Sequence, residues 1–170
     1  MSRAGVDLDE AALLAWGRRL GRRARENRVF VALYGPLGAG KTTLVRAACR
    51  GAGVRDQVSS PTFALVHRHA TGAEPVYHVD LYRIGSAEEL AGLGWEDLLS
   101  ADGPVFLEWA DRAGSELPPD RWDVRLSFGS CPRTRRVEVV RCGAVIDAPS
   151  LTGPCPAGAR EAPADSGREG

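Results

Sequence analysis

The sequence lacks the features that mark membrane, secreted and zinc-binding proteins. Its longest apolar runs, such as residues 29–34, are far shorter than the roughly 20 residues of a transmembrane helix. The first nine residues have neither the basic start nor the apolar centre of a secretory signal, so we expect a cytoplasmic protein with reduced thiols and no membrane partner. None of the four cysteines forms a C-x-x-C pair, and no histidine stands at metal-ligand spacing from them, which argues against structural zinc.

An excess of charge of either sign is also absent, because 22 basic and 22 acidic residues give a formal net charge of zero. A strongly basic surface therefore does not determine the choice of partner, although a local basic patch is compatible with the composition. Arg18, Arg19, Arg22 and Arg23 cluster in one predicted helix. Such a cluster can touch RNA, but a solvated helix face is the commoner explanation.

Strand-like and helix-like segments alternate along the chain, which predicts an α/β fold with a mostly parallel central sheet and helices on its faces, in three layers. An amphipathic helix is expected over about residues 8–26, behind a capping box that begins at Asp7. Patterns of buried strands occupy residues 29–34 and 104–107, and strand-like segments occupy residues 63–67 and 76–81. Further helices are expected at residues 42–50 and after the capping box at 86–89.

The C-terminal third changes character. A strand of period two is expected at residues 122–128, with inward side chains at Trp122, Val124, Leu126 and Phe128. A second such strand surrounds residues 137–139, and residues 129–133 suit a hairpin, so we expect an antiparallel addition to the sheet. After residue 145, Ala, Pro and Gly dominate. This predicts a domain at residues 1–145 and a disordered tail at 146–170.

One segment carries a specific chemical signal. Residues 35–42 match G-x-x-x-x-G-K-[ST] at every defined position, after a predicted strand and at the start of a predicted helix. The glycines let successive N–H groups converge on a phosphate, and the helix adds its positive dipole end. Lys41, the only lysine in the chain, supplies a compact charge for the outer phosphates, and the Thr42 hydroxyl suits Mg²⁺. The segment predicts a P-loop that binds ATP.

A P-loop enzyme also needs an acidic residue near the metal, usually at the end of a neighbouring strand. Glu108 follows the buried strand 104–107, and Asp80 lies near the end of the strand at 76–81. The alternative for Glu108 is an ordinary exposed residue at a strand end, which is the less favoured explanation, and the alternative for Asp80 is a structural hydrogen bond at a strand terminus. Spacing does not choose between them.

Four motifs together resemble the TsaE family, the small bacterial ATPases needed to make N6-threonylcarbamoyladenosine in tRNA. They are Leu37–Thr43, Ser60–Phe63, Tyr77–Arg83 and Glu108–Trp109, and the resemblance runs from about residue 9 to residue 140. It implies an α/β P-loop fold and hydrolysis of Mg-ATP. It further implies action with the threonylcarbamoyl transferase TsaD and its companion TsaB, with tRNA as an indirect partner through that complex.

The resemblance also implies roles for particular residues. The loop residues expected around the nucleotide are Gly35, Gly38, Ala39, Gly40, Lys41, Thr42 and Thr43. Thr42 and Glu108 would hold Mg²⁺, and Asp80 matches the family's acid that is tied to hydrolysis or to positioning water. With Lys41, these two acids form the expected catalytic set.

Three further positions carry a looser resemblance. Residues 60–62 look like the family's switch-like loop, and Trp109 matches a position near the nucleotide or a partner, although a large aromatic there is also compatible with the core. Arg133 stands where the family often has a basic residue near the nucleotide, and the neighbouring Arg135 and Arg136 leave the register open. Pro36 departs from the Asp that is common in the family, which leaves any partner contact of that Asp in doubt.

Two other functions use a P-loop. A small-molecule kinase needs an arginine-rich lid, and the only dense candidate, residues 133–136, falls in the predicted hairpin. A GTPase switch needs an N-K-x-D-type motif, which the sequence lacks. The kinase is the alternative to the ATPase.

Overall fold

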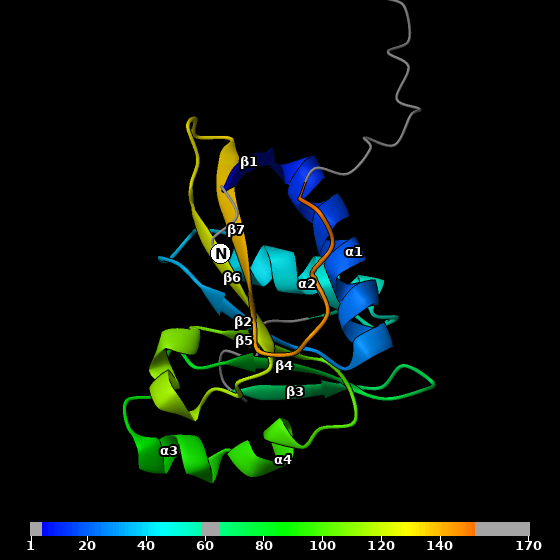
Figure 1. Cartoon of the computed structure of the whole chain (residues 1–170), viewed down its shortest axis with the longest axis vertical. Helices are drawn as coiled ribbons and strands as arrows, with labels where there is room; N and C mark the ends of the chain where they lie inside the picture. The colour runs from blue at the N-terminus through cyan, green and yellow to red at the C-terminus, as the bar shows by residue number, and fades with distance from the viewer. Residues whose placement is uncertain (1–4, 59–64, 152–170) are drawn as a thin grey trace, which may run out of the picture.

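The computed structural model describes residues 5–58 and 65–151, which form one seven-stranded sheet with helices on both faces (Figure 1). The strands are β1 (Val6–Asp9), β2 (Phe30–Tyr34), β3 (Val66–His69), β4 (Val76–Asp80), β5 (Val105–Glu108), β6 (Arg121–Phe128) and β7 (Thr134–Cys142). The helices are α1 (Glu10–Asn27), α2 (Lys41–Gly51), α3 (Ala87–Gly92) and α4 (Trp95–Leu99), with the 3₁₀ turns η1 (Ala110–Arg112) and η2 (Gly114–Glu116).

The strand order is β1-β7-β6-β2-β5-β4-β3. β2 lies parallel to both β5 and β6, and β4 lies parallel to β5. β3 and the β6–β7–β1 side add antiparallel pairs at the two ends of the sheet. The predicted α/β class with a mostly parallel centre is thus confirmed. Because β2, β5 and β4 are parallel neighbours, their carboxyl ends meet at one edge, where open α/β sheets bind ligands.

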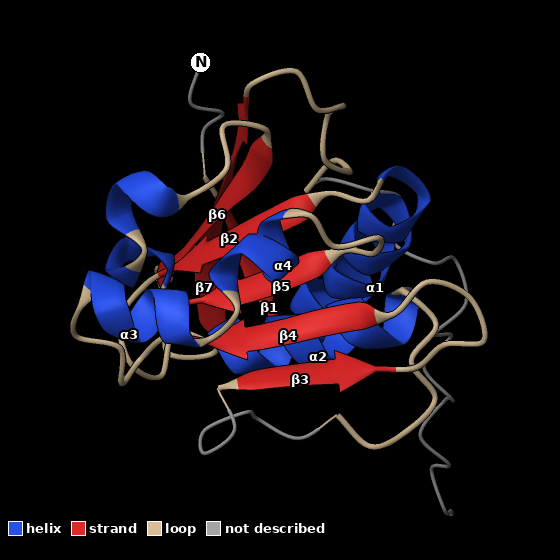
Figure 2. Cartoon of the chain, turned by 90° about the horizontal axis from the view of Figure 1, so that it is seen from below, coloured by secondary structure: helices blue, strands red, loops and turns tan. Residues whose placement is uncertain are grey.

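Helices α1 and α2 cover one face of the sheet and α3 and α4 the other (Figure 2), and a hydrophobic core lies beneath each pair. Alternate side chains of β2 serve both: Val31 and Leu33 pack in the core that contains α1 and α2, whereas Phe30 and Ala32 pack in the core that contains α3 and α4. This two-sided burial explains the continuous apolar run of β2, as expected for a central parallel strand. The result is a three-layer arrangement, helices on sheet on helices.

The start of α1 differs from the prediction. Val6–Asp9 forms β1, paired with β7, and the helix begins only after it. Asp9, not Asp7, is the N-cap, and its Oδ1 accepts a hydrogen bond of 2.8 Å from the Ala12 amide. The Asp7 carboxylate instead accepts from the Ser130 amide at 2.7 Å. A pairing with a strand more than 120 residues away decided this boundary, and no local pattern reports such a pairing.

The predicted C-terminal hairpin is present, as β6 and β7 joined by residues 129–133. β6 also runs parallel to β2, so the hairpin joins the sheet through a parallel pair. The prediction that Phe128 faces inward is wrong, since 60% of its surface is exposed at the end of the hairpin.

Contacts with the domain continue past the predicted boundary at residue 145. The indole N–H of Trp122 donates to the Ile146 carbonyl at 2.7 Å, and that of Trp16 donates to the Pro149 carbonyl at 3.1 Å. Val145, Ile146, Ala148 and Leu151 pack on the core beside α1. The domain therefore extends at least to Leu151, while residues 152–170 lie outside the described part.

The described segments contain no helix with the length and apolarity to cross a bilayer. Of the strand predicted at residues 63–67, positions 63 and 64 lie outside the described residues, and β3 begins at Val66.

Candidate functional site

The loop between β2 and α2 depends on glycine at two positions. Gly40 is the N-cap of α2 with φ 97°, a left-handed conformation that strains other residues, and its carbonyl accepts the first helical bond from Leu44 N at 2.9 Å. Gly35 has φ 140°, and a Cβ there would collide with the carbonyl oxygen of Leu126 on β6. The tight packing of the loop against β6 fixes the path that leads into the N-terminus of α2.

Lys41 extends back over this loop with only 4% of its surface exposed. Its Nζ donates to the carbonyl oxygens of Gly35 at 2.6 Å and Pro36 at 2.9 Å, and lies 3.7 Å from the centre of the Trp109 ring. Pro36 lacks an N–H, but its carbonyl contributes to holding the ammonium group. Burial lowers the pKa of Lys41, and the nearby carboxylates of Glu108 and Asp80 oppose that shift. The ammonium group of the single lysine is thus held by the main chain of the loop itself.

Glu108 is held through both of its carboxylate oxygens and is only 1% exposed. Thr42 Oγ1 donates to Oε2 at 2.8 Å, and His78 Nε2 lies 2.8 Å from Oε1. His78 itself is fully buried on β4, and its Nδ1 has no hydrogen-bond partner among the described residues. Among the described residues the imidazole therefore makes one side-chain hydrogen bond, and this bond orients the Glu108 carboxylate.

This contact of His78 was not predicted from the sequence, although a signal was present. A histidine in the middle of an otherwise apolar buried strand must satisfy its polar atoms, and so implies a polar partner nearby. The partner of His78 is Glu108 on β5, and the pairing of β5 with β4 was not predicted.

Asp80 lies directly across from Glu108, at the ends of the paired strands β4 and β5. Its Oδ1 accepts from the Tyr82 amide at 2.9 Å, and 8% of its surface is exposed. Burial raises the pKa of Asp80; the hydrogen bond from Tyr82 opposes the shift and the Glu108 charge adds to it. Both candidate acids of the sequence therefore reach the loop, but only Glu108 contacts Thr42.

Trp109 turns sharply as the chain leaves β5. Its φ of 59° is uncommon for a residue other than glycine and folds the indole back toward the loop. The ring lies 4.9 Å from that of Tyr82, centre to centre, beside the Lys41 ammonium group. Trp109 therefore lines the cavity at the loop and also packs against the core that contains α3 and α4.

Two cavities flank the loop. One of about 390 Å³ is lined by Lys41, Thr42, Asp80, Glu108 and Trp109 among others, and the second of about 570 Å³ lies between the start of α1 and the β6–β7 turn. Gly38, Gly40 and Thr43 line both, so the two cavities adjoin across the loop.

Two of the three arginines considered for the nucleotide site line the second cavity. Arg133 and Arg135 line it, together with Asp9, the N-cap of α1. Arg136 turns elsewhere, toward Asp7 and Glu138. The predicted Arg133 thus reaches the loop region, with Arg135 as an addition. The switch-like residues 60–62 lie outside the described residues.

The oxygen donors at the loop fit a magnesium ion. Within residues 5–58 and 65–151 no three His, Cys, Asp or Glu side chains gather as a metal cage. Mg²⁺ does not need one, because it is usually held by one or two carboxylates together with water and substrate phosphates. The Thr42 hydroxyl and the Glu108 carboxylate, already 2.8 Å apart, form such a partial set.

Comparison with known proteins shows the family of the chain. Residues 8–137 match the family model described as threonylcarbamoyl adenosine biosynthesis protein TsaE. The chain belongs to the TsaE family.

Individual relatives support the assignment of this TsaE-family chain. It is 32% identical over 136 residues to the tRNA threonylcarbamoyladenosine biosynthesis protein TsaE of Haemophilus influenzae, covering 78% of this chain and 85% of that protein. It is 42% identical over 113 residues to the protein of the same name in Streptomyces coelicolor, covering 65% and 75%. The crystal structure of Bacillus subtilis YdiB superposes with a TM-score of 0.68 at 23% identity, covering 84% of this chain and 88% of that one, and this supports the fold.

Proposed function

We propose that this TsaE-family chain is a magnesium-dependent ATPase that acts with TsaD and TsaB in the threonylcarbamoylation of tRNA adenosine. The observation that carries the proposal is the 2.8 Å contact between Thr42 of the P-loop and the buried Glu108, beside the single lysine. A hydroxyl, a carboxylate and an ammonium group within one loop site are the groups that Mg-ATP requires. The names of the relatives support the place in tRNA modification.

The roles of the residues follow from their positions. Lys41 would exchange its two carbonyl contacts for phosphate oxygens, which are stronger acceptors. The main-chain N–H groups between Gly35 and Thr43 would surround the phosphates at the positive end of α2. Bound Mg²⁺ would neutralise charge that develops on the phosphates, with Thr42 and Glu108 as its protein ligands.

Asp80 and Trp109 would complete the phosphate side. Asp80 faces the same cavity but is not bonded to Thr42, which suits it to orient the attacking water. Trp109 would exclude solvent from the phosphates. The larger cavity beside Arg133 would take the remainder of the nucleotide.

The test is ATP hydrolysis by the purified full-length chain, measured alone and with TsaD and TsaB. Lys41→Ala should reduce hydrolysis by at least about 100-fold, because an electrostatic contact to the transferred group is lost. Leu37→Ala is the matched control from the same loop, since 74% of Leu37 is exposed, and it should keep a rate close to that of the wild type.

Two results would contradict the proposal. One is undiminished hydrolysis by a Lys41→Ala protein whose circular dichroism is unchanged. The other is threonylcarbamoylation of tRNA by TsaD and TsaB that proceeds equally well without this chain, under conditions of repeated turnover. Phosphate transfer to a small molecule in place of water would favour the kinase alternative.

A further inference from the structure

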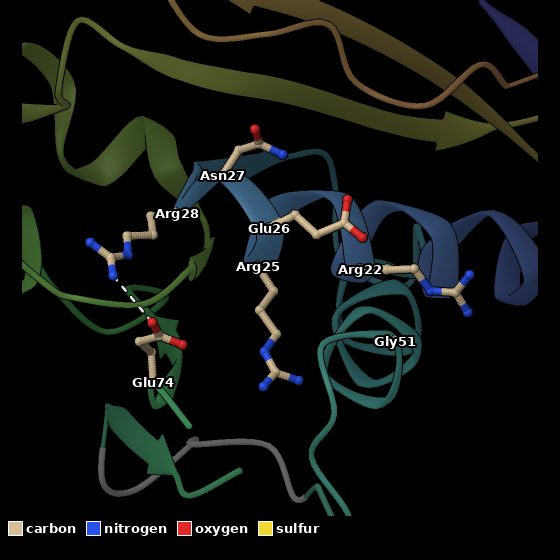
Figure 3. A pocket seen from close by; sticks show the side chains of 7 residues that line it. All are labelled: Arg22, Arg25, Glu26, Asn27, Arg28, Gly51 and Glu74. Atoms are coloured by element: carbon tan, nitrogen blue, oxygen red, sulfur yellow. Dashed lines mark hydrogen bonds and ion pairs between the residues drawn. The ribbon is translucent and has the colours of Figure 1, made fainter. Parts of the chain in front are cut away.

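A surface of six arginines lies on the helical face of α1 and α2, away from the nucleotide cavities. This surface includes two cavities of about 660 and 420 Å³. We call it the arginine surface, and its arginines are Arg18, Arg22, Arg25, Arg28, Arg46 and Arg50. The two cavities lie close to one another on α1 and α2, since Arg50 and Gly51 are consecutive and Arg18 lies one turn from Arg22. Figure 3 shows the larger cavity, with Arg25 extending from α1 into it.

Helix geometry and close packing bring these side chains together. Arg18, Arg22 and Arg25 recur at intervals of four and three residues, which places them on one side of α1, and Arg46 and Arg50 do the same on α2. The two helices approach closely at Gly51, where a Cβ would collide with the Arg18 carbonyl. Two rows of guanidinium groups therefore flank one seam.

These arginines are not neutralised by neighbouring acids. Only two carboxylates, those of Glu26 and Glu74, line the same cavities, and only Arg28 is paired, with Glu74 at 3.1 Å. Arg25 and Arg50 donate to main-chain carbonyls, which leave their charge intact. Within the described residues, no carboxylate lies within ion-pair distance of the other three.

The charge of the molecule is divided between the two faces of the sheet. The segment 86–102, which contains α3 and α4, carries five acidic residues and no Lys or Arg. It packs in the core on the face opposite to α1 and α2. A net charge of zero therefore conceals a basic α1–α2 face, which attracts a polyanion, and an acidic segment on the opposite face, which repels one.

The arginine surface also lacks what a protein partner would need. The large exposed apolar side chains of the described residues are Leu37, Tyr82, Leu99 and Phe128, and none lies on it. Protein interfaces have an apolar, often aromatic, centre, whereas a nucleic-acid backbone requires mainly spaced cations. From Arg18 to Arg25 the helix rises about 10 Å, which is enough to reach neighbouring phosphates along a backbone.

We infer that the arginine surface binds the sugar–phosphate backbone of RNA, so that this chain contacts RNA directly and on a face separate from its nucleotide site. The choice of RNA among nucleic acids rests on the proposed function in tRNA modification; the polyanion contact rests on the arginines themselves. Binding is independent of base sequence and decreases steeply with salt, because each phosphate contact releases counterions.

The test is the affinity of the full-length chain for an unmodified tRNA transcript, measured by fluorescence anisotropy as salt is varied. Each phosphate contact contributes a slope of about −0.7 in log K against log salt for single-stranded nucleic acid. Arg22→Gln with Arg46→Gln should therefore make the slope shallower by about 1.4 and weaken binding about 25-fold at 0.1 M salt. Either single variant should lose about fivefold.

The matched control removes two exposed arginines elsewhere, Arg68→Gln with Arg141→Gln, and should leave the slope unchanged. Equal losses in the two double variants would overturn the inference, and so would an unchanged slope in Arg22→Gln with Arg46→Gln. If that variant instead loses binding to polyglutamate or to TsaD and TsaB while keeping tRNA, the surface serves an acidic protein and the inference is wrong.

ATP hydrolysis is measured on the same preparations, to separate this inference from the proposed function. The Arg22→Gln with Arg46→Gln protein should hydrolyse ATP at the wild-type rate, since both side chains lie outside the loop cavities. Absence of hydrolysis in the wild type would contradict the proposed ATPase activity, but it would not affect the measured contribution of the arginine surface to tRNA binding.

Discussion

At the scale of single residues, the two acids of the site differ in what already holds them. Both oxygens of Glu108 are bonded, to Thr42 and to His78, so its carboxylate is oriented before any metal arrives. Asp80 has one bond, to a backbone amide at the rim of the same cavity. This difference predicts a division of labour, with Glu108 acting through the metal and Asp80 through water.

Replacing each acid by alanine separates the two roles. Glu108→Ala should weaken Mg-ATP binding and shift the Mg²⁺ dependence of hydrolysis upward, because a metal ligand is lost. Asp80→Ala should bind Mg-ATP nearly as the wild type does, yet lose turnover by roughly 100-fold, because its contact matters mainly in the transition state. Calorimetry and steady-state rates with TsaD and TsaB measure the two effects.

The reverse pattern would exchange the roles of the two acids. If neither variant changes affinity or rate, both acids are structural, and the proposed site is restricted to the loop.

His78 offers a third test at this scale. His78→Phe fills the buried space but leaves Glu108 Oε1 without its partner, so the Mg²⁺ concentration for half-maximal hydrolysis should rise several-fold. His78→Gln retains an N–H donor and should recover part of the loss. A wild-type Mg²⁺ dependence in His78→Phe would show that the imidazole does not position the carboxylate. The same conclusion would follow if His78→Phe and His78→Gln lost equal thermal stability and neither changed the Mg²⁺ dependence of hydrolysis.

At the scale of elements, the sequence predicts what neighbours in the chain decide. The turn into α2 was predictable because Gly40, Lys41 and Thr42 specify it locally, and β2 was predictable because burial on both faces leaves a continuous apolar run. The contact of His78 with Glu108 was not, because it depends on β4 lying beside β5. The extent of the C-terminal segment was also missed: its composition is that of a loop, while its contacts are made by tryptophans far away in the sequence.

That segment supports a prediction about truncation. A chain that ends at Leu151 should keep the melting temperature of the full chain, because the contacts through residue 151 remain. A chain that ends at Val145 loses the acceptors of two indole N–H groups and the packing of Ile146 and Leu151. Each unsatisfied buried donor costs about 1–3 kcal/mol, so the melting temperature should fall by at least about 4 °C.

Differential scanning calorimetry of the two truncated chains beside the full chain makes the measurement. Equal melting temperatures for the chains ending at Val145 and at Leu151 would mean that residues 146–151 add no stability. A lower value for the chain ending at Leu151 would instead mean that residues 152–170 also stabilise the domain.

At the scale of the whole molecule, the candidate site is built from segments that only the sheet order brings together. The loop after β2, the ends of β4 and β5 and the β6–β7 turn all border the two adjoining cavities. A nucleotide that occupies both would connect the two sides of β2, including the β6–β7 hairpin. Binding should therefore stabilise the domain as a unit and not the loop alone.

Thermal unfolding with nucleotide tests this directly. A ligand at 100 times its Kd adds about 2.7 kcal/mol to the free energy of unfolding, which for a chain of this size corresponds to a rise in melting temperature of about 5–10 °C. Mg-ATP should produce this rise, and ATP with a chelator a smaller one, because Thr42 and Glu108 then lack the metal between them and the phosphates. Lys41→Ala should abolish the rise at the same nucleotide concentration, whereas Leu37→Ala should keep it. An equal rise in Lys41→Ala would locate the nucleotide somewhere other than the P-loop, and an equal rise without Mg²⁺ would remove Glu108 from the metal site.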